Sequence, residues 1–316
     1  MILVCGEALI DLFVDLSGAD VRAAAPARAA PGGSPMNVAI GLRRLGVASG
    51  FFGALSNDGF GERLAALLAR ENVALDFAPR LSRRTTLSVV ALDERGAPTY
   101  NFYGDGAADV SLDASHLPSA LPCAVVALAF GSYTLAVDPV GAAYLALARR
   151  EADRRVVSLD ANLRPGVTPK LDVWRARFHD FVACASIVKA SDEDIALGYG
   201  PEAPIDGVAA DWLARGASLV VVTRGARGSS AYTRSRRVDA PARRVALVDT
   251  VGAGDAAHAA LLARLTQRGA LSKSGLATLS EAALRDVLDY ANAAGALACT
   301  RAGADPPSAQ EVARML

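Results

Sequence analysis

A glycine-rich turn that ends in an aspartate is the part of the sequence best suited to chemistry. It runs from Val248 through Gly252, Ala253 and Gly254 to Asp255, and an apolar segment of helical period follows it. Glycines let such a turn bring backbone N–H groups to a helix N-terminus, where an anion such as phosphate is favoured. A carboxylate beside that anion can take a proton from an attacking hydroxyl. A plain helix start, in which Asp255 only complements the helix dipole, fits the same residues.

Three further stretches place polar residues or glycines where a predicted helix begins or a predicted strand ends. They are Pro31–Ala39, before an apolar helix, and Ser158–Pro165 and Val220–Gly228, which contain strand ends. Open α/β sheets bind ligands at the carboxyl ends of their strands, so all three are candidate binding positions. Each also fits an ordinary connection between two elements.

Several common catalytic and cofactor-binding motifs are missing, which excludes the reactions that depend on them. The sequence has no P-loop, no dinucleotide fingerprint after the first strand, no G-x-S-x-G and no H-E-x-x-H. Of three histidines, His258 follows Asp255 by one helical turn on an apolar face. We predict that His258 is a packed, hydrogen-bonded core residue rather than a catalytic one.

Composition excludes several classes of protein. The 316 residues are 52% hydrophobic and 21% charged, which fits a globular chain rather than a disordered one. Lys plus Arg and Asp plus Glu are both 33, so no overall positive field exists to attract nucleic acid or anionic lipid. The four cysteines form no C-x-x-C pair, and we expect reduced, mostly buried thiols. Without a predicted signal peptide or membrane span, we expect a cytoplasmic protein with no nucleic-acid or membrane partner.

The elements that must position these residues follow an α/β pattern. Short β-branched runs alternate with alanine-rich helical segments, which predicts a mostly parallel sheet with crossover helices. The predicted strands are Ile2–Val4, Ala124–Phe130, Val156–Asp160, Ile187–Lys189 and Leu219–Thr223. The predicted helices include Met36–Leu45, Gly61–Arg70 and Pro139–Arg150.

One region breaks this alternation. Leu87–Leu92 and Pro98–Tyr103 are strand-like runs joined by Asp93-Glu94-Arg95-Gly96, which predicts a hairpin. With Leu9–Leu16 and the Pro/Ala-rich stretch before Gly32, the hairpin would form a small second sheet. Such a sheet is either a lid over a cleft or an ordinary edge structure, and periodicity favours neither.

Four features in one order resemble the ribokinase-like, or PfkB, carbohydrate kinases. They are Gly6-Glu7-Ala8-Leu9-Ile10-Asp11, Gly32-Gly33 with Asn37, Gly53 with Asp58 and Phe60-Gly61, and Asp249–Asp255. The resemblance spans nearly the whole chain and is strongest to bacterial fructokinases. It implies one domain, 1–316, with a three-layer α/β/α body and a β-sheet lid built from about 9–31 and 86–106.

The resemblance also implies an activity, which is ATP-dependent phosphorylation of a free sugar at a primary hydroxyl. Fructose is the expected sugar; 2-keto-3-deoxygluconate, ribose or a nucleoside are alternatives, and a non-catalytic sugar sensor is the alternative from another class. By position in the motif, Asp255 is the general base, and Gly252, Ala253 and Gly254 direct N–H groups toward the γ-phosphate.

The remaining site residues are carried over from the family by position. Sugar-binding positions are Asp11, Gly32, Gly33, Asn37, Phe102, Tyr103 and Arg164. Nucleotide-binding positions are Lys189, Thr223, Gly225, Gly228 and Asn292. Such kinases use Mg²⁺ with ATP, here with Asp194 as an indirect contact, and many use a monovalent cation such as K⁺, here near Asp249 and Val251. A monomer or a homodimer is expected.

Three positions depart from the family pattern. The usual N-x-x-E is Ser191-Asp192-Glu193-Asp194, so Asp194 stands where a glutamate is expected. Gly104 follows Phe102-Tyr103 where fructokinases commonly carry an arginine, and His258 replaces a more usual aromatic. We expect Asp194 to affect the reaction rate or metal binding, and Gly104 to affect sugar specificity. We expect His258 to affect packing.

Overall fold

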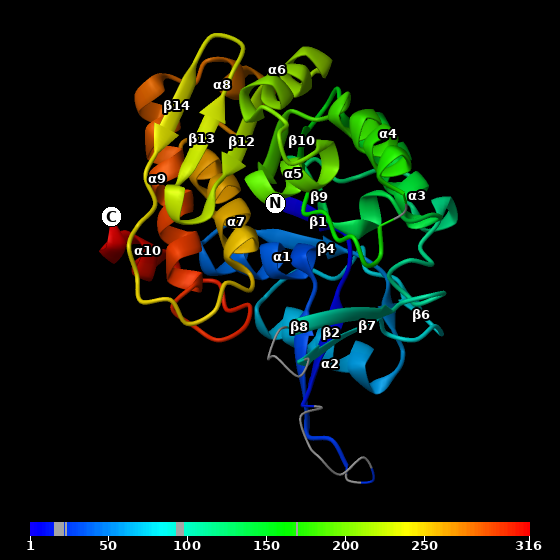
Figure 1. Cartoon of the computed structure of the whole chain (residues 1–316). Coiled ribbons are helices and arrows are strands. Elements are labelled where there is room, and N and C mark those ends of the chain that lie inside the picture. Colours follow the sequence, from blue (N-terminus) through cyan, green and yellow to red (C-terminus); the bar gives the residue numbers. More distant parts are fainter. Residues whose placement is uncertain (16–21, 23, 93–97, 169) are drawn as a thin grey trace.

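A twisted eight-stranded sheet forms the centre of the molecule (Figure 1). The computed structural model describes residues 1–15, 22, 24–92, 98–168 and 170–316. The strand order is β14-β13-β12-β11-β10-β9-β1-β4, in which the six from β12 to β4 are parallel and β13 pairs antiparallel with both of its neighbours, β12 and β14. Their bounds are β1 Ile2–Cys5, β4 Ser49–Phe52, β9 Ala127–Gly131, β10 Val156–Asp160, β11 Ile187–Ser191, β12 Leu219–Thr223, β13 Ser229–Tyr232 and β14 Arg237–Ala240.

Helices cover both faces of this sheet, which explains why its parallel strands are almost wholly apolar. Side chains alternate along β1, so Ile2 and Val4 belong to one core cluster and Leu3 and Cys5 to the other. The first cluster is built with α1 Ser34–Arg44, α7 Ala253–Gln267 and α9 Glu281–Ala298. The second is built with α3 Val140–Glu151, α4 Leu171–Val182 and α6 Ile205–Arg215. The predicted three-layer α/β/α body is therefore confirmed.

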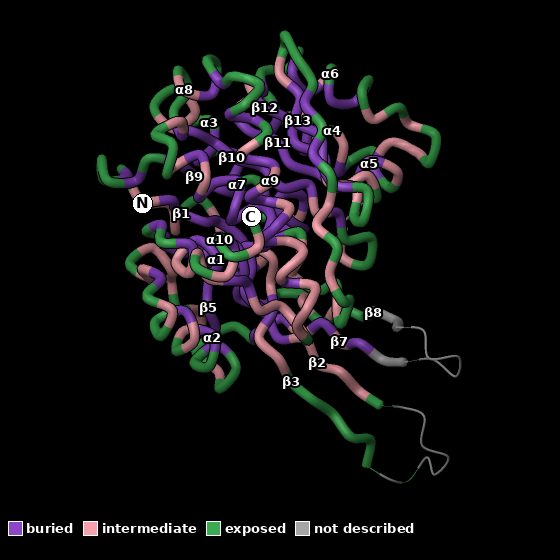
Figure 2. Tube along the Cα trace, turned by 90° about the vertical axis from the view of Figure 1, so that its left-hand side faces the viewer, coloured by how far each residue is buried: buried purple, intermediate pink, exposed green. Residues whose placement is uncertain are grey.

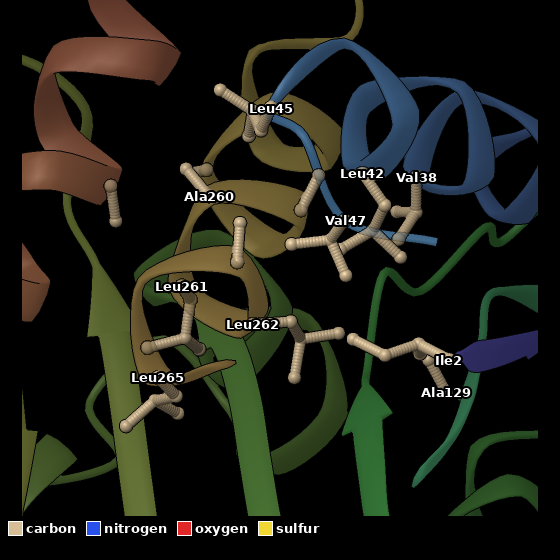
Figure 3. Close-up of a cluster of buried hydrophobic side chains, with 14 of the residues drawn as sticks. Ile2, Val38, Leu42, Leu45, Val47, Ala129, Ala260, Leu261, Leu262 and Leu265 are labelled. Atoms are coloured by element: carbon tan, nitrogen blue, oxygen red, sulfur yellow. The ribbon is translucent and has the colours of Figure 1, made fainter. Parts of the chain in front are cut away.

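Helices α1 and α7 lie side by side on the first face. Figure 3 shows Val38 and Leu42 of α1 and Leu262 of α7 gathered above Ile2 of β1. This packing brings the N-terminal ends of both helices to the carboxyl edge of the parallel strands. The other helices are α2 Gly59–Arg70, α5 Asp192–Tyr199, α8 Lys273–Ala277 and α10 Ala309–Met315.

A second sheet projects from the body, and we call it the small sheet. Its order is β3-β2-β7-β8, with bounds β3 Ala27–Gly32, β2 Leu9–Val14, β7 Leu87–Leu92 and β8 Pro98–Tyr103. Figure 2 shows it as a half-buried to exposed extension of the buried core. The predicted turn at Asp93-Glu94-Arg95-Gly96 lies outside the described residues. A short pair, β5 Leu55–Ser56 with β6 Arg80–Leu81, lies near α2.

The predicted strand bounds are correct where an apolar run has clear polar or turn residues at its ends. Val156–Asp160 and Leu219–Thr223 are found as predicted. The predicted start at Ala124 is wrong, because Val125 donates to Pro122 O (3.0 Å) in a turn and the strand begins at Ala127. The expectation of mostly buried thiols is also wrong, since one of the four cysteines, Cys5, is buried, whereas Cys184 and Cys299 are partly exposed and Cys123 is exposed. Within the described ranges, no helix has the length and apolarity needed to cross a membrane.

Candidate active site

The first turn of α7 requires glycine at the position that precedes the helix. Gly252 has φ 78°, in the left-handed region, and a Cβ there would lie 2.9 Å from Ala304 Cα. Helix α7 then begins at Ala253, whose N–H donates to Thr250 O (3.2 Å). The N–H groups of a first helical turn have no acceptors within the helix, so this turn presents donors and the positive end of the helix dipole.

Asp255 lies in this turn and is held by two side chains of α1. Ser34 Oγ donates to its Oδ1 (2.6 Å) and Asn37 Nδ2 donates to its Oδ2 (2.8 Å). The carboxylate is 9% exposed. The glycine-rich stretch before α1 and the turn before α7 therefore meet at one carboxylate. Sequence reasoning had not assigned Ser34 a role, although its i, i+3 spacing to Asn37 on one helix face was available.

A buried ion pair supplies a cation beside the same turn. Lys189 Nζ lies 2.7 Å from Asp160 Oδ2, and both side chains are buried. Burial, the largest single effect, lowers the pKa of Lys189, but the carboxylates of Asp160, Asp194 and Asp255 together outweigh it and the pKa is raised. A Cβ on Gly254 would lie 3.3 Å from Lys189 Nζ. The ammonium group is therefore next to the first turn of α7.

His258 supports this ion pair as a neutral imidazole. Its Nε2 lies 2.8 Å from Ser158 Oγ and its Nδ1 lies 3.6 Å from Asp160 Oδ2. Burial, with a smaller effect of the Lys189 charge, lowers the pKa of His258 to about 3. The prediction of a packed, hydrogen-bonded core histidine is confirmed.

The expected sugar-binding residues come from the small sheet and its connection to α1. The carboxyl group of Asp11 on β2 lies against Gly32 at the end of β3. A Cβ on Gly32 would lie only 2.2 Å from Asp11 Oδ2. Gly33 has φ 109°, and a Cβ there would lie 2.7 Å from Glu7 O. Burial raises the pKa of Asp11, while Ser88 and the exposed Arg164 oppose this shift.

Phe102 and Tyr103, which are adjacent on β8, do not share a face of the small sheet. The Phe102 ring meets the Tyr133 ring edge-on, with centroids 6.1 Å apart. Tyr103 is 65% exposed, and successive strand residues point to opposite faces. In the sheet register Phe102 lies opposite Ser88 and Ser88 lies opposite Asp11. Phe102 is therefore on the same face as Asp11, which we call the site side, and Tyr103 is on the other face.

The expected nucleotide-binding residues follow β12. Thr223 ends that strand, and the turn η3 Gly225–Arg227 leads to Gly228, where a Cβ would lie 2.1 Å from Ala240 O. Gly225, with φ 52°, faces open space. Asn292 on α9 accepts from Ser229 Oγ (2.8 Å) and donates to Pro241 O (3.1 Å), so its amide also joins β13 to the segment after β14.

Asp194 has both carboxylate oxygens occupied by protein donors. Its Oδ1 accepts from Leu163 N (2.8 Å), and its Oδ2 accepts from Ser191 N and Oγ (2.8 Å each). The second set forms a capping box at the start of α5. This arrangement fits an indirect rather than a direct role at Mg²⁺. Among the described residues, no group of three His, Cys, Asp or Glu side chains is placed to hold a metal.

Asp249 joins the glycine turn to the segment before α10. Its Oδ1 accepts from Val251 N (3.0 Å) and its Oδ2 from Gly303 N (2.8 Å). Burial alone would raise the pKa of Asp249, but these N–H donors outweigh it and the pKa is lowered. An ionised carboxylate at this position is compatible with a nearby monovalent cation.

Comparisons with known proteins agree with this geometry. The model of the pfkB family of carbohydrate kinases matches residues 1–311. A fructokinase of Rhizobium leguminosarum bv. trifolii is 42% identical over 286 residues, covering 90% of this chain and 86% of that protein.

Two solved structures extend the likeness to the fold. The fructokinase of Xylella fastidiosa with bound ATP matches with TM-score 0.89 and 30% identity, covering 99% of this chain and 97% of that one. A double mutant of the Vibrio cholerae O395 fructokinase, in its fructose-, ADP- and potassium-bound form, matches with TM-score 0.82 and 30% identity, covering 100% and 98%. With the α/β/α body, the projecting sheet and a family match over nearly its whole length, this chain belongs to the pfkB family of carbohydrate kinases.

Proposed function

We propose that this protein is a fructokinase, which transfers the γ-phosphoryl group of ATP to a primary hydroxyl of fructose. Its similarity to fructokinases over nearly the whole chain supports the sugar and the donor. The observation that carries the chemistry is the placement of Asp255. Its carboxylate stands in the first turn of α7, held by Ser34 and Asn37, with the Lys189 ammonium beside that turn.

Asp255 acts as the general base in this proposal. A carboxylate offers about four lone-pair positions, so the bonds from Ser34 and Asn37 leave room to accept a hydroxyl proton. Those two donors fix the rotamer of the base and stabilise its charge before the sugar arrives. Asp11, Asn37 and Arg164 would bind sugar hydroxyls, with Gly32 and Gly33 allowing close approach and Phe102 covering the ring.

The first turn of α7 receives the transferring phosphoryl group. The transition state spreads charge over that group's oxygens, so backbone donors and cations supply most of the stabilisation. Gly252 and Gly254 would direct N–H groups at it, the Ala253 N–H would have to be shared with or released from Thr250 O, and Lys189 adds a fixed positive charge. The Thr223–Gly228 turn and Asn292 would hold the nucleotide.

Two cations complete the proposal. Mg²⁺ would neutralise the ATP phosphates, with Asp194 acting indirectly through the loop it orders. K⁺ would bind near Asp249 and Val251 and support the turn that carries Gly252. The potassium bound in the Vibrio cholerae relative supports this second cation.

The small sheet would serve as a lid. In this proposal the chain works as one kinase domain, 1–316, with lid segments of about 9–31 and 86–106. Closing the lid would exclude water from the phosphoryl group and so favour the sugar hydroxyl as acceptor. A homodimer or a monomer is compatible with this mechanism.

A second candidate substrate is 2-keto-3-deoxygluconate. The exposed Arg164 is close enough to Glu7 and Asp11 for its charge to oppose, in small part, the rise of their pKa values by burial. A guanidinium at that position suits a substrate carboxylate as well as a phosphate.

A sugar panel tests the proposal. ADP release is measured with ATP and Mg²⁺, with and without K⁺, over fructose, 2-keto-3-deoxygluconate, ribose and nucleosides. We expect the highest kcat/KM with fructose. A higher value for another sugar would move the assignment to that sugar, and sugar binding without ADP release would support a sensor instead.

A further inference from the structure

A buried carboxylate connects the small sheet to the body, outside the proposed chemistry. Asp109 lies in the segment that follows β8 and is 2% exposed. Thr86 Oγ1 donates to its Oδ1 and the Tyr133 hydroxyl donates to its Oδ2. Thr86 immediately precedes β7, and Tyr133 begins η2 Tyr133–Leu135 in the body. One side chain therefore bonds to both the small sheet and the body.

Backbone contacts make the same region the root of the small sheet. Thr86 O accepts from Ile10 N of β2 (3.1 Å), and Ala108 N donates to Arg84 O (2.9 Å). A Cβ on Gly104 would lie 3.1 Å from Thr86 Oγ1, so the chain leaving β8 passes close to Thr86. The small sheet cannot change its angle to the body without disturbing the bonds to Asp109.

A second buried carboxyl group, that of Glu7, lies near Asp109. Glu7 lies between β1 and β2 and is buried, with Thr134 Oγ1 3.3 Å from its Oε2. Burial raises the pKa of Glu7 to about 8, and Ser132 only partly opposes this. Burial also raises the pKa of Asp109, and the hydroxyls of Thr86 and Tyr133 only partly oppose this rise.

The same contacts determine where Phe102 lies. Its ring packs edge-on against Tyr133, the residue whose hydroxyl bonds to Asp109. Phe102 is on the site side of β8. A change in the hydrogen bonds of Asp109 would therefore shift Tyr133 and, through it, Phe102, the aromatic residue expected above the sugar.

We propose that Asp109 is a positioning residue for the kinase reaction, which sets the angle of the small sheet and the place of Phe102 through Thr86 and Tyr133. The effect of Asp109 on sugar affinity rests on the proposed function, the phosphorylation of fructose. The structural part of the inference, the fixed angle of the sheet, does not depend on which sugar is used.

A matched pair of tyrosine variants tests this. Tyr133→Phe removes the hydroxyl that bonds to Asp109, and Tyr144→Phe removes a hydroxyl that donates to Phe52 O (2.7 Å) wholly within the body. Both tyrosines are buried. We expect Tyr133→Phe to raise the KM for fructose about fivefold, as the loss of one buried hydrogen bond would, and to leave the KM for ATP unchanged. Tyr144→Phe should lower the melting temperature without changing either KM.

Hydrogen exchange of the ligand-free protein separates this inference from the proposed function. Tyr133→Phe should speed exchange in β7 and β8 relative to β9 and β10, and Tyr144→Phe should not. Asp109→Asn, which keeps one acceptor oxygen, should act in the same direction and non-additively with Tyr133→Phe. Equal exchange and equal KM effects in the two tyrosine variants would overturn the inference. If the wild-type protein does not phosphorylate fructose, the proposed function fails while the exchange data still decide the role of Asp109.

Discussion

Asn37 Nδ2 donates a hydrogen bond to Asp255 Oδ2 across 2.8 Å, joining residues 218 positions apart in the sequence. Asn37 belongs to α1, which begins directly after β3 of the small sheet, and Asp255 belongs to the first turn of α7. The proposed base is therefore oriented by a helix whose start is fixed by the segment expected to bind sugar. Packing of α1 against α7 in the body core holds this contact (Figure 3).

Removing the amide of Asn37 should impair both binding and chemistry. Asn37→Ala deletes one of the two side-chain donors to Asp255, and a hydrogen bond to a charged group contributes about 1.5–3 kcal/mol. We expect kcat/KM for fructose to fall about tenfold or more, measured by coupled ADP release. Ser34→Ala should act in the same direction through Oδ1. Unchanged kcat/KM in both variants would mean that the base does not depend on α1.

The first turn of α7 should not tolerate a side chain at Gly254. In Gly254→Val the new carbons would meet the Lys189 ammonium, since the Cβ position lies 3.3 Å from Nζ. We expect kcat to fall at least tenfold without unfolding of the chain. Gly59→Val is the matched control, because Gly59 also lies in a first helical turn and a Cβ there meets nothing within 4 Å. Equal activity of the two variants would place the phosphoryl site elsewhere.

Stability should fall as pH rises because of Glu7. Its pKa is about 8 in the folded protein, against 4.5 for the ordinary side chain, so the folded state keeps a proton that the unfolded state has lost. This contribution is complete below pH 4.5 and declines by about 1.4 kcal/mol per pH unit up to about pH 8. Urea unfolding at pH 6.5 and pH 8 should show a smaller loss of stability in Glu7→Gln than in the wild-type protein. The same pH slope in both proteins would show that Glu7 is ionised in the fold.

Cation removal should stop the reaction. The carboxylates of Asp249 and Asp255 have no cationic side chain within salt-bridge distance among the described residues, and the phosphates of ATP would add further negative charge beside them. Chelation with EDTA should abolish ADP release, and added Mg²⁺ should restore it. Replacing K⁺ by choline at equal ionic strength should lower the rate if a monovalent cation binds near Asp249. A rate that is the same in choline would rule out that cation.

The overall fold could be predicted because its signals are local. Strands Val156–Asp160 and Leu219–Thr223 are apolar runs with clear ends, and the hairpin strands of the small sheet match the predicted Leu87–Leu92 and Pro98–Tyr103. The capping box at Ser191 and Asp194 is likewise a short-range pattern. Each of these features depends on residues within a few positions of one another.

The partners within the site could not be predicted because they depend on strand order and packing. Asp160 and Lys189 are neighbours in register across β10 and β11, which only the sheet order reveals. The bonds of Ser34 to Asp255 and of Tyr133 to Asp109 cross between elements in the same way. The family resemblance gives both Phe102 and Tyr103 as residues above the sugar, whereas strand alternation puts their side chains on opposite faces of the small sheet.

The central claim is that Asp255 removes the proton of the sugar hydroxyl, and the turnover of Asp255→Asn tests it most directly. A general base typically contributes about 10²–10⁴-fold, so kcat should fall by at least that range while calorimetry shows fructose binding within a few-fold of wild type. Asp286→Asn, which alters a carboxylate paired with Arg264 away from the site, should retain full activity. Turnover of Asp255→Asn near the wild-type rate would contradict the account.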